Sequence, residues 1–307
     1  MAKKLKIAFL SRFQGEVSRG VETYVEELSK RLAKNHDVKI LKGSSGEKYD
    51  VVIPTNGRLQ SLKAGFGRLF GGYKVIIPGQ AGIGRDDIWN IAITIPDVYV
   101  ALTDFEANWA KKWAWKTKVV KIPNGVDLSR FHPTGSHLAR LKPIILSVGT
   151  LDWYKHHERT INAMEFVDGS LIIVGSGPKK NELLALGNKK IPGRLKIISL
   201  EYEEIPKAYR SADLFVLPSW DRESFGIVYV EAMASGLPVI APNDLSRREI
   251  IGDAGIFIDT SDPEVFARAI NEALKKDWKD LPRKQAEKFS WDFVAEKYEK
   301  LLEELFK

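Results

Sequence analysis

The chain of 307 residues contains no cysteine. The missing thiols exclude disulfide bonds, thiolate zinc sites and cysteine nucleophiles, and they agree with a reducing compartment. No apolar run approaches the roughly 20 residues of a membrane-spanning helix. The apolar run near the N-terminus stops at Ser11-Arg12, which is too short for a signal peptide and predicts a first strand. We therefore expect a soluble, cytoplasmic protein.

Negative charge is scarce in the first part of the chain. The net charge is +7, and residues 1–133 contain 22 Lys and Arg against 13 Asp and Glu, whereas residues 134–307 contain 25 against 27. A surface rich in Lys and Glu, as in heat-stable proteins, does not explain an excess in one half. We find no nucleic-acid motif and expect no nucleic acid as a partner. An anionic membrane surface or an anionic acceptor stays open.

Short apolar runs alternate with amphipathic stretches along the whole chain, as is typical of parallel strands buried on both faces and the helices that connect them. Strands are expected at Leu5–Leu10, Val38–Lys42, Val51–Pro54, Val75–Pro78, Val98–Leu102, Val119–Ile122, Ile144–Val148, Leu171–Val174, Leu195–Ile198, Leu214–Leu217, Val239–Ala241 and Ile256–Ile258. Helices are expected at Val21–Lys34, Phe105–Trp115, Glu158–Phe166, Pro263–Lys276 and Trp291–Phe306. This βαβ pattern, given twice, predicts an α/β fold with two Rossmann-like, doubly wound domains.

A turn-rich break separates the two series of strands. It lies within Arg130–Lys142, contains Pro133 and Gly135, and precedes a fresh strand. We expect domains at residues 1–133 and 134–290. Ligands of such sheets bind at the carboxyl ends of the strands, so a ligand cleft is expected between the two domains.

The densest pattern of chemically useful residues is at 220–241. Glu223 and Glu231 are eight residues apart, separated by a Ser-Phe-Gly turn and the start of a helix-like stretch that ends at Gly236-Leu-Pro. A strand, a small-residue turn and a helix N-terminus together form an anion site, because unpaired N–H groups and the helix dipole both favour phosphate. An acid placed just before that turn needs another partner, such as the hydroxyl groups of the same ligand.

With its flanks, this stretch resembles the E-x7-E motif of the retaining glycosyltransferases of family 4, which have the two-domain GT-B fold. The resemblance covers nearly the whole chain. It implies that Glu223 contacts hydroxyls of the donor sugar and that Glu231 contacts the ribose hydroxyls of the nucleotide. It also implies that the turn at Ser224, Phe225 and Gly226 binds the donor, with the amides of Phe225 and Gly226 on the diphosphate.

The resemblance extends to other loops of the second domain. It identifies Lys155 with the lysine that neutralises the leaving diphosphate, and it places Thr150 where the family has an arginine. A neighbouring cation such as Arg247 is a candidate to compensate. Gly175, Gly177 and Ile198 match the donor-side glycine loop and the strand end near the base. The alternatives are a solvated loop lysine, a tight turn and an ordinary buried strand end.

The first domain matches the family less well. Gly20 fits one glycine of the pair that approaches the diphosphate, but Arg19 replaces the other; a loop before a helix is the alternative. We find no histidine in the position where many members have one facing the acceptor. The matching stretch, 77–87, offers Gln80, Arg85, Asp86 and Asp87 as acceptor-side candidates by position. Asp86 and Asp87 are equally expected as acids in the first turn of a helix.

Two basic stretches with large apolar side chains, 58–70 and 109–116, have two interpretations. Their aromatic side chains either pack on the sheet or form a patch for anionic lipid. Trp109 and Trp113, four residues apart, are expected on one helix face.

The resemblance implies transfer of a hexosyl group from a UDP- or GDP-linked sugar to an acceptor hydroxyl, with retention of anomeric configuration. We find no Asp-x-Asp signature at a strand end and expect no metal and no cofactor. Residues 1–133 would then lie on the acceptor side, 134–290 would bind the donor, and 291–307 would cross back to the first domain. The acceptor is unknown, with lipid-linked or anionic acceptors open and a peripheral position at the inner membrane face. The alternatives are a catalytically weak partner subunit, motivated by Thr150 and the absent histidine, and a sugar-nucleotide epimerase on the same fold.

Overall fold

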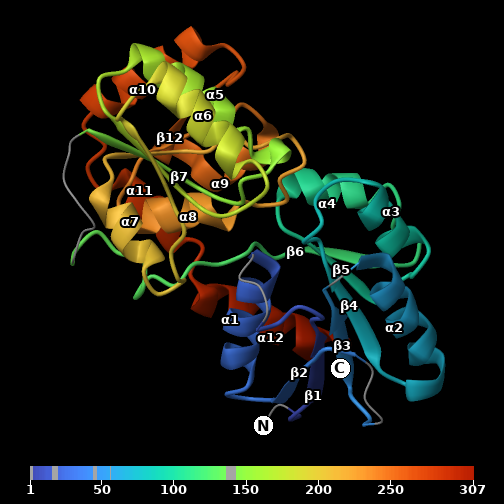
Figure 1. Ribbon diagram of the computed structural model, residues 1–307. Coiled ribbons are helices and arrows are strands. Elements are labelled where there is room, and N and C mark those ends of the chain that lie inside the picture. Colours follow the sequence, from blue (N-terminus) through green and yellow to red (C-terminus); the bar gives the residue numbers. More distant parts are fainter. Residues whose placement is uncertain (1–2, 16–19, 44–46, 56, 136–142) are drawn as a thin grey trace. The chain divides into compact units, whose positions relative to one another are not determined.

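The computed structural model describes residues 3–15, 20–43, 47–55, 57–135 and 143–307 (Figure 1). The chain forms two compact units. Unit 1 comprises Met1–Gly125, Arg222–Phe225 and Phe289–Lys307, and unit 2 comprises Val126–Asp221 and Gly226–Lys288. The chain first passes from one unit to the other at Gly125–Val126; the break expected at Arg130–Lys142 lies partly outside the described residues.

Unit 1 contains a parallel sheet in the order β2-β1-β3-β4-β5-β6. Its strands are β1 (Lys6–Leu10), β2 (Asp37–Leu41), β3 (Val51–Pro54), β4 (Lys74–Pro78), β5 (Val98–Ala101) and β6 (Lys118–Lys121). Its helices are α1 (Gly20–Leu32), α2 (Gly57–Gly71), α3 (Arg85–Ala92), α4 (Asp104–Ala110) and α12 (Trp291–Leu305). The order of strands reverses between β1 and β3, which is the position where ligands approach a doubly wound sheet.

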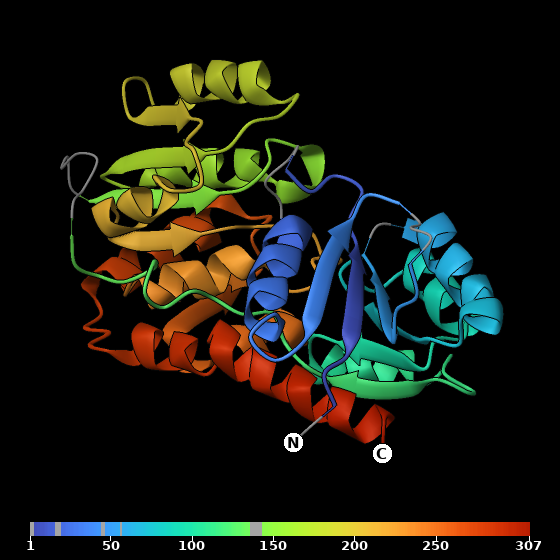
Figure 2. The ribbon, with the colours of Figure 1, turned by 90° about the horizontal axis from the view of Figure 1, so that it is seen from below.

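Both faces of the first sheet are covered by helices, as its apolar strands require. On one face, α1 and α12 pack against β1, β3 and β5 through Tyr24, Trp291 and Tyr298. Figure 2 shows α12, red in the colour scale, beside the blue strands of this unit. The phenol oxygens of Tyr24 and Tyr298 are 2.7 Å apart, so these buried side chains satisfy each other's polar groups. On the other face, α2, α3 and α4 pack on the sheet through small side chains such as Ala64 and Ala110.

Unit 2 contains the second parallel sheet, in the order β12-β11-β10-β7-β8-β9. Its strands are β7 (Ile144–Val148), β8 (Ser170–Val174), β9 (Leu195–Ile198), β10 (Leu214–Val216), β11 (Val239–Pro242) and β12 (Gly255–Ile258). Its α-helices are α5 (His157–Ala163), α6 (Lys180–Lys190), α7 (Ile205–Ser211), α8 (Ile227–Ala234), α9 (Leu245–Ile251), α10 (Pro263–Lys275) and α11 (Leu281–Glu287), and its 3-10 helices are η1 (Trp153–Lys155), η2 (Met164–Phe166) and η3 (Gly252–Ala254). The order of strands reverses between β7 and β10, so the loops after these strands flank the expected ligand position.

The predicted α/β fold with two doubly wound sheets is confirmed, and each predicted strand is present with its ends shifted by at most one residue. The prediction that Trp109 and Trp113 share a helix face is wrong. Helix α4 ends at Ala110, and Lys112 N and Trp113 N instead donate to the carbonyls of Trp109 and Ala110 in a turn. Trp113 therefore lies outside the helix, and the four-residue spacing does not place the two tryptophans on one helix face.

Candidate active site

The loop after β7 carries Thr150 and Lys155. The buried side chain of His157 lies within hydrogen-bonding distance of both β7 and this loop. The Nδ1 atom of His157 is 3.1 Å from Ser147 Oγ, and its Nε2 atom is 3.2 Å from the carbonyl oxygen of Thr150. Burial lowers the pKa of His157 to about 4. The neutral ring can donate to the Thr150 carbonyl and accept from Ser147. The start of the Lys155 loop is thus held by a histidine that stays neutral near pH 7.

Three candidate donor loops meet at the carboxyl ends of β7, β8 and β9. A Cβ atom at Gly175 would collide with the carbonyl oxygen of Gly149, and one at Gly177 would meet backbone atoms of Leu151. The Gly175 N–H also donates to the carbonyl of Ile198 over 2.8 Å. Both glycines are therefore needed for backbone packing. The structure brings Thr150, the glycine pair and Ile198 together.

The loop after β10, which leads to Glu223, is tied to the Lys155 loop. Trp220 N donates to the carbonyl of Tyr154 over 2.9 Å, and the hydroxyl groups of Thr150 and Tyr154 are 3.1 Å apart. Arg247 is 2% exposed and donates to the carbonyls of Ser219 and Trp220 over 3.0 and 2.6 Å. It also forms an ion pair with Asp244. Arg247, the candidate to compensate for Thr150, thus holds this loop in place.

Glu231 lies on α8 and faces α7. The Tyr209 hydroxyl donates to Glu231 Oε2 over 2.8 Å. Burial raises the pKa of Glu231 to about 7, against the smaller lowering effects of the Tyr209 bond and the charge of Arg130. Helix α8 begins after Gly226, whose φ of 74° is in the left-handed region that favours glycine. Its first turn contains no acidic side chain.

Glu223 lies in the short segment Arg222–Phe225, which belongs to unit 1. The Ser224 hydroxyl donates to the carbonyl of Gln80 over 3.2 Å. Gly82 has a φ of +80°, and a Cβ atom there would collide with the carbonyl oxygen of Arg222. The segment therefore packs closely on the loop between β4 and α3. This contact brings Ser224 and Gln80 together, two residues that the sequence assigned to different ligands.

The four acceptor-side candidates have different surroundings. The side-chain amide of Gln80 pairs with that of Asn124 in both directions, over 2.8 and 3.0 Å. Arg85 is exposed at the start of α3, and Asp86 forms an ion pair with Arg58. Asp87 is fully buried, and burial raises its pKa to about 7. Of the four, Gln80 accepts a hydrogen bond from the Glu223 segment through its backbone carbonyl.

Sequence reasoning missed a buried acidic cluster below Gly79. The Tyr99 hydroxyl donates to Glu106 Oε1, and Leu102 N donates to Glu106 Oε2, both over 2.8 Å. Burial, with the charge of Asp87 as a smaller cause, raises the pKa of Glu106 well above its usual value. A Cβ atom at Gly79 would collide with Glu106. Thr103 followed by Glu106 is a helix-capping pattern that the sequence could have predicted. The contacts of Glu106 with Tyr99 and Leu102 have no such local signal.

Gly20 is the first residue of α1, and its neighbour Arg19 lies outside the described residues. In the described part of the chain, no three His, Cys, Asp or Glu side chains are grouped to hold a metal ion. Across the same residues, no helix combines the length and the apolar character needed to cross a membrane. A cavity of about 580 Å³ opens at the ends of β10, β11 and β12, and its lining includes Arg247 and His156, the residue after Lys155.

Comparison with known proteins agrees with this architecture. Residues 135–290 match the family described as glycosyl transferases group 1. The chain is 29% identical over 213 residues to a phosphatidyl-myo-inositol mannosyltransferase of Mycolicibacterium smegmatis, covering 64% of this chain and 54% of that protein. The chain spans about half the length of the curated relatives it matches.

Two solved structures have the same fold over nearly the whole chain. A sucrose-phosphate synthase from Thermosynechococcus elongatus superposes with a TM-score of 0.86 at 19% identity, covering 99% of both chains. The HepE protein of Anabaena, solved in complex with UDP-glucose, superposes with a TM-score of 0.80 at 17% identity, covering 97% of this chain and 99% of that one. At these identities the likeness establishes the GT-B fold.

Proposed function

We propose that this chain, which belongs to the group 1 glycosyl transferases, moves a hexosyl group from a UDP- or GDP-linked sugar to an acceptor hydroxyl with retention of configuration. The observation that carries the proposal is the meeting of the Thr150–Lys155 loop, the Gly175/Gly177 loop and Ile198 at the carboxyl ends of three adjacent strands. The UDP-glucose complex of the structurally similar HepE supports a nucleotide-sugar donor.

Each side chain has a proposed role in this reaction. Glu231 accepts hydrogen bonds from the ribose hydroxyls, and Glu223 accepts them from the sugar. Lys155 neutralises the leaving diphosphate, together with the amides of Phe225 and Gly226 at the start of α8. Ser224 and Gly20 complete the donor site. A fixed lysine charge can stabilise the leaving group in place of a metal ion, so we propose metal-independent catalysis.

The proposed mechanism needs no nucleophile from the protein. The leaving diphosphate oxygen takes the proton of the acceptor hydroxyl on the face where the new bond forms, and the protein mainly positions the reactants. Residues 134–290 would bind the donor. Residues 1–133 would bind the acceptor near Gln80, Arg85, Asp86 and Asp87, with residues 291–307 returning to that domain.

A panel of UDP- and GDP-sugars, scored by thermal shift, tests this function. The true donor should raise the melting temperature most, because a ligand that binds only the folded state stabilises it. Transfer to an acceptor should continue in EDTA and should give the retained anomer by NMR. No nucleotide binding would favour the weak partner subunit, and conversion of the donor sugar without an acceptor would favour the epimerase.

We also propose that unit 1 binds an anionic membrane surface through α2. Leu59, Phe66 and Phe70 are 75%, 63% and 91% exposed. With Lys63 they follow the i, i+4, i+7, i+11 spacing of one helix face. The opposite face is made of small residues such as Ala64 and Gly65, where a Cβ on Gly65 would meet Thr94. The helix thus turns its largest apolar side chains to the solvent, an arrangement suited to a lipid interface.

A lipid-linked acceptor would give this surface a purpose, and the phosphatidylinositol acceptor named for the mycobacterial relative supports one. The excess of basic residues in 1–133 supports anionic lipid in particular. The protein would then be cytoplasmic and peripheral at the inner membrane face.

Co-sedimentation with vesicles checks the α2 surface. The Phe66→Ser/Phe70→Ser double variant should bind anionic vesicles at least about tenfold more weakly, since each buried phenylalanine contributes about 1.5–3 kcal/mol. Phe166→Ser, at an exposed phenylalanine of unit 2, serves as the matched control and should bind normally. Equal vesicle binding by all three proteins would rule the surface out. So would a double variant that binds vesicles normally but no longer self-associates, since α2 would then contact a second copy of the chain.

A further inference from the structure

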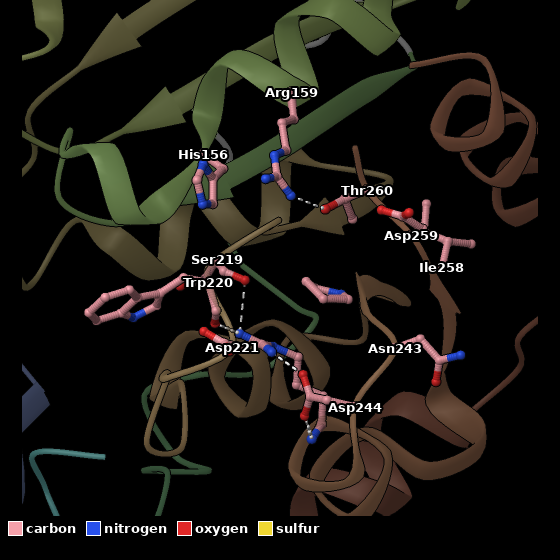
Figure 3. A pocket seen from close by; sticks show the side chains of 12 residues that line it. His156, Arg159, Ser219, Trp220, Asp221, Asn243, Asp244, Ile258, Asp259 and Thr260 are labelled. Carbon is pink, nitrogen blue, oxygen red and sulfur yellow. Dashed lines mark hydrogen bonds and ion pairs between the residues drawn. The ribbon is translucent and has the colours of Figure 1, made fainter. Parts of the chain in front are cut away.

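The cavity at the ends of β10, β11 and β12 has no role in the transferase reaction proposed above. Its walls come from the loops that follow these three strands and from His156 and Arg159 beyond β7. In Figure 3, His156 and Arg159 lie on one side of a common space, with Asn243 and Asp244 opposite. The carboxyl ends of parallel strands are the usual binding edge of such a sheet. A volume of about 580 Å³ is in the range of small-molecule sites.

The cavity is built on buried polar side chains. Ser219, Arg247 and Thr260 line it and are each 2% exposed. Arg247 donates to two carbonyls of the β10 loop, and Arg159 Nη1 donates to Thr260 Oγ1 over 3.1 Å. The bond to Thr260 holds the Arg159 guanidinium at the edge of the cavity, and the bonds of Arg247 hold the β10 loop. The lining is therefore preorganised, which lowers the entropic cost of binding.

The charges of the lining argue against an ionic ligand. Arg247 is neutralised by Asp244. The other charged groups of the lining include Arg159 and the carboxylates of Asp221 and Asp259, and Arg159 is close enough to Asp259 to help lower the pKa of that carboxyl. A phosphate group would meet these two carboxylates, and like charges repel. Among the described residues, no three acidic or histidine side chains come close enough to hold a metal ion. The remaining class is a neutral ligand that both donates and accepts hydrogen bonds.

Aromatic rings extend the site beyond the cavity. Trp220 is part of the lining, and its ring centroid is 5.2 Å from that of Trp153 and 5.5 Å from that of Tyr154. Trp153 is 56% exposed. In Figure 3 the Trp220 ring points away from the centre of the cavity. Aromatic faces beside hydrogen-bonding side chains suit the apolar C–H faces and the hydroxyl groups of a sugar.

We propose that this cavity is a second saccharide site, separate from the donor site, in which one sugar unit lies among Arg159, Asn243, Asp221 and Asp259 and the next lies on Trp220 and Trp153. Two linked units explain why the polar cavity and the aromatic rim are adjacent. Because His156, the residue after Lys155, lines the cavity, an occupant would lie beside the end of the Lys155 loop. The site does not depend on the transferase reaction.

Titration of the full chain with α-linked mannobiose and maltose tests the site. Quenching of tryptophan fluorescence should report binding, and calorimetry should give the affinity. The variants Arg159→Met and Asn243→Ala should each weaken binding about tenfold, the value of a lost hydrogen bond to a charged or amide group. Arg268→Met removes an exposed arginine of α10 in the same unit and should leave the affinity unchanged.

Binding of neither disaccharide would overturn the proposal, and so would equal binding by wild type and Asn243→Ala, whose exposed position makes a folding defect a poor explanation. If the protein instead binds inorganic phosphate or Mg²⁺, and Arg159→Met or Asp259→Asn abolishes that binding, the cavity is an ion site and the saccharide proposal is wrong. UDP and GDP binding, measured on the same samples, separates this result from failure of the proposed transferase function.

Discussion

Replacing Glu223 by alanine should lower the turnover number about a hundredfold and leave nucleotide affinity nearly unchanged. The carboxylate is proposed to accept hydrogen bonds from the donor sugar, and charged hydrogen bonds of this kind contribute about 1.5–3 kcal/mol. The sugar becomes electron-poor as the bond to the diphosphate breaks, so the interaction strengthens in the transition state and acts on kcat more than on KM. Release of nucleoside diphosphate from the donor chosen by the panel measures the effect.

The environment of Glu223 makes this result interpretable. Its segment is held by the Ser224 bond to Gln80 and by the Phe225 ring, which packs 5.7 Å from that of Phe289. The alanine variant keeps both of these contacts. Glu203→Ala, at an exposed glutamate of unit 2, is the control. A Glu223→Ala protein with normal turnover and weakened nucleotide binding would mean that the roles of Glu223 and Glu231 are exchanged.

The sequence predicted the sheets well because their strands are buried on both faces. Runs such as Val51–Pro54 and Ile144–Val148 are apolar at most positions, and burial of the run leaves little choice of structure. The end of α4 was harder to predict. No glycine or proline marks a stop at Ala110, and the chain leaves the helix there through a turn that depends on tertiary packing.

Local motifs located the donor loops but not the contacts that hold them. The glycines at 175 and 177 marked a close approach, yet the partner loop at Gly149 and Leu151 became visible only in three dimensions. His157 was hidden for the same reason, since one histidine in a sequence does not reveal a buried bond to Ser147 or Thr150. The aromatic group of Trp153, Tyr154 and Trp220 combines two segments more than 60 residues apart. Pairings of this range have no local signal.

Glu231→Gln should remove a pH dependence from both stability and nucleotide affinity. Burial raises the pKa of the folded-state carboxyl to about 7, from 4.5. A raised acid pKa means that folding favours the protonated form, so the wild type loses stability as the pH rises from about 4.5 to about 7. The linked change is about 3 kcal/mol. The free energy of unfolding, measured in urea, should therefore be lower at pH 8 than at pH 4.5 in wild type. In Glu231→Gln this difference should be smaller by about 3 kcal/mol.

Nucleotide binding should depend on pH in the opposite direction. Ribose hydroxyls donate best to the ionised carboxylate, so wild-type affinity for UDP or GDP should increase up to about pH 7 and then level off. Glu231→Gln should bind about tenfold more weakly above pH 7, with a flat profile. Asp87 also has its pKa raised to about 7 and adds its own slope to the unfolding curves, but it is present in both proteins and cancels in their difference. Parallel profiles for the two proteins would show that Glu231 does not titrate on folding or binding, and that the ribose is held by another group.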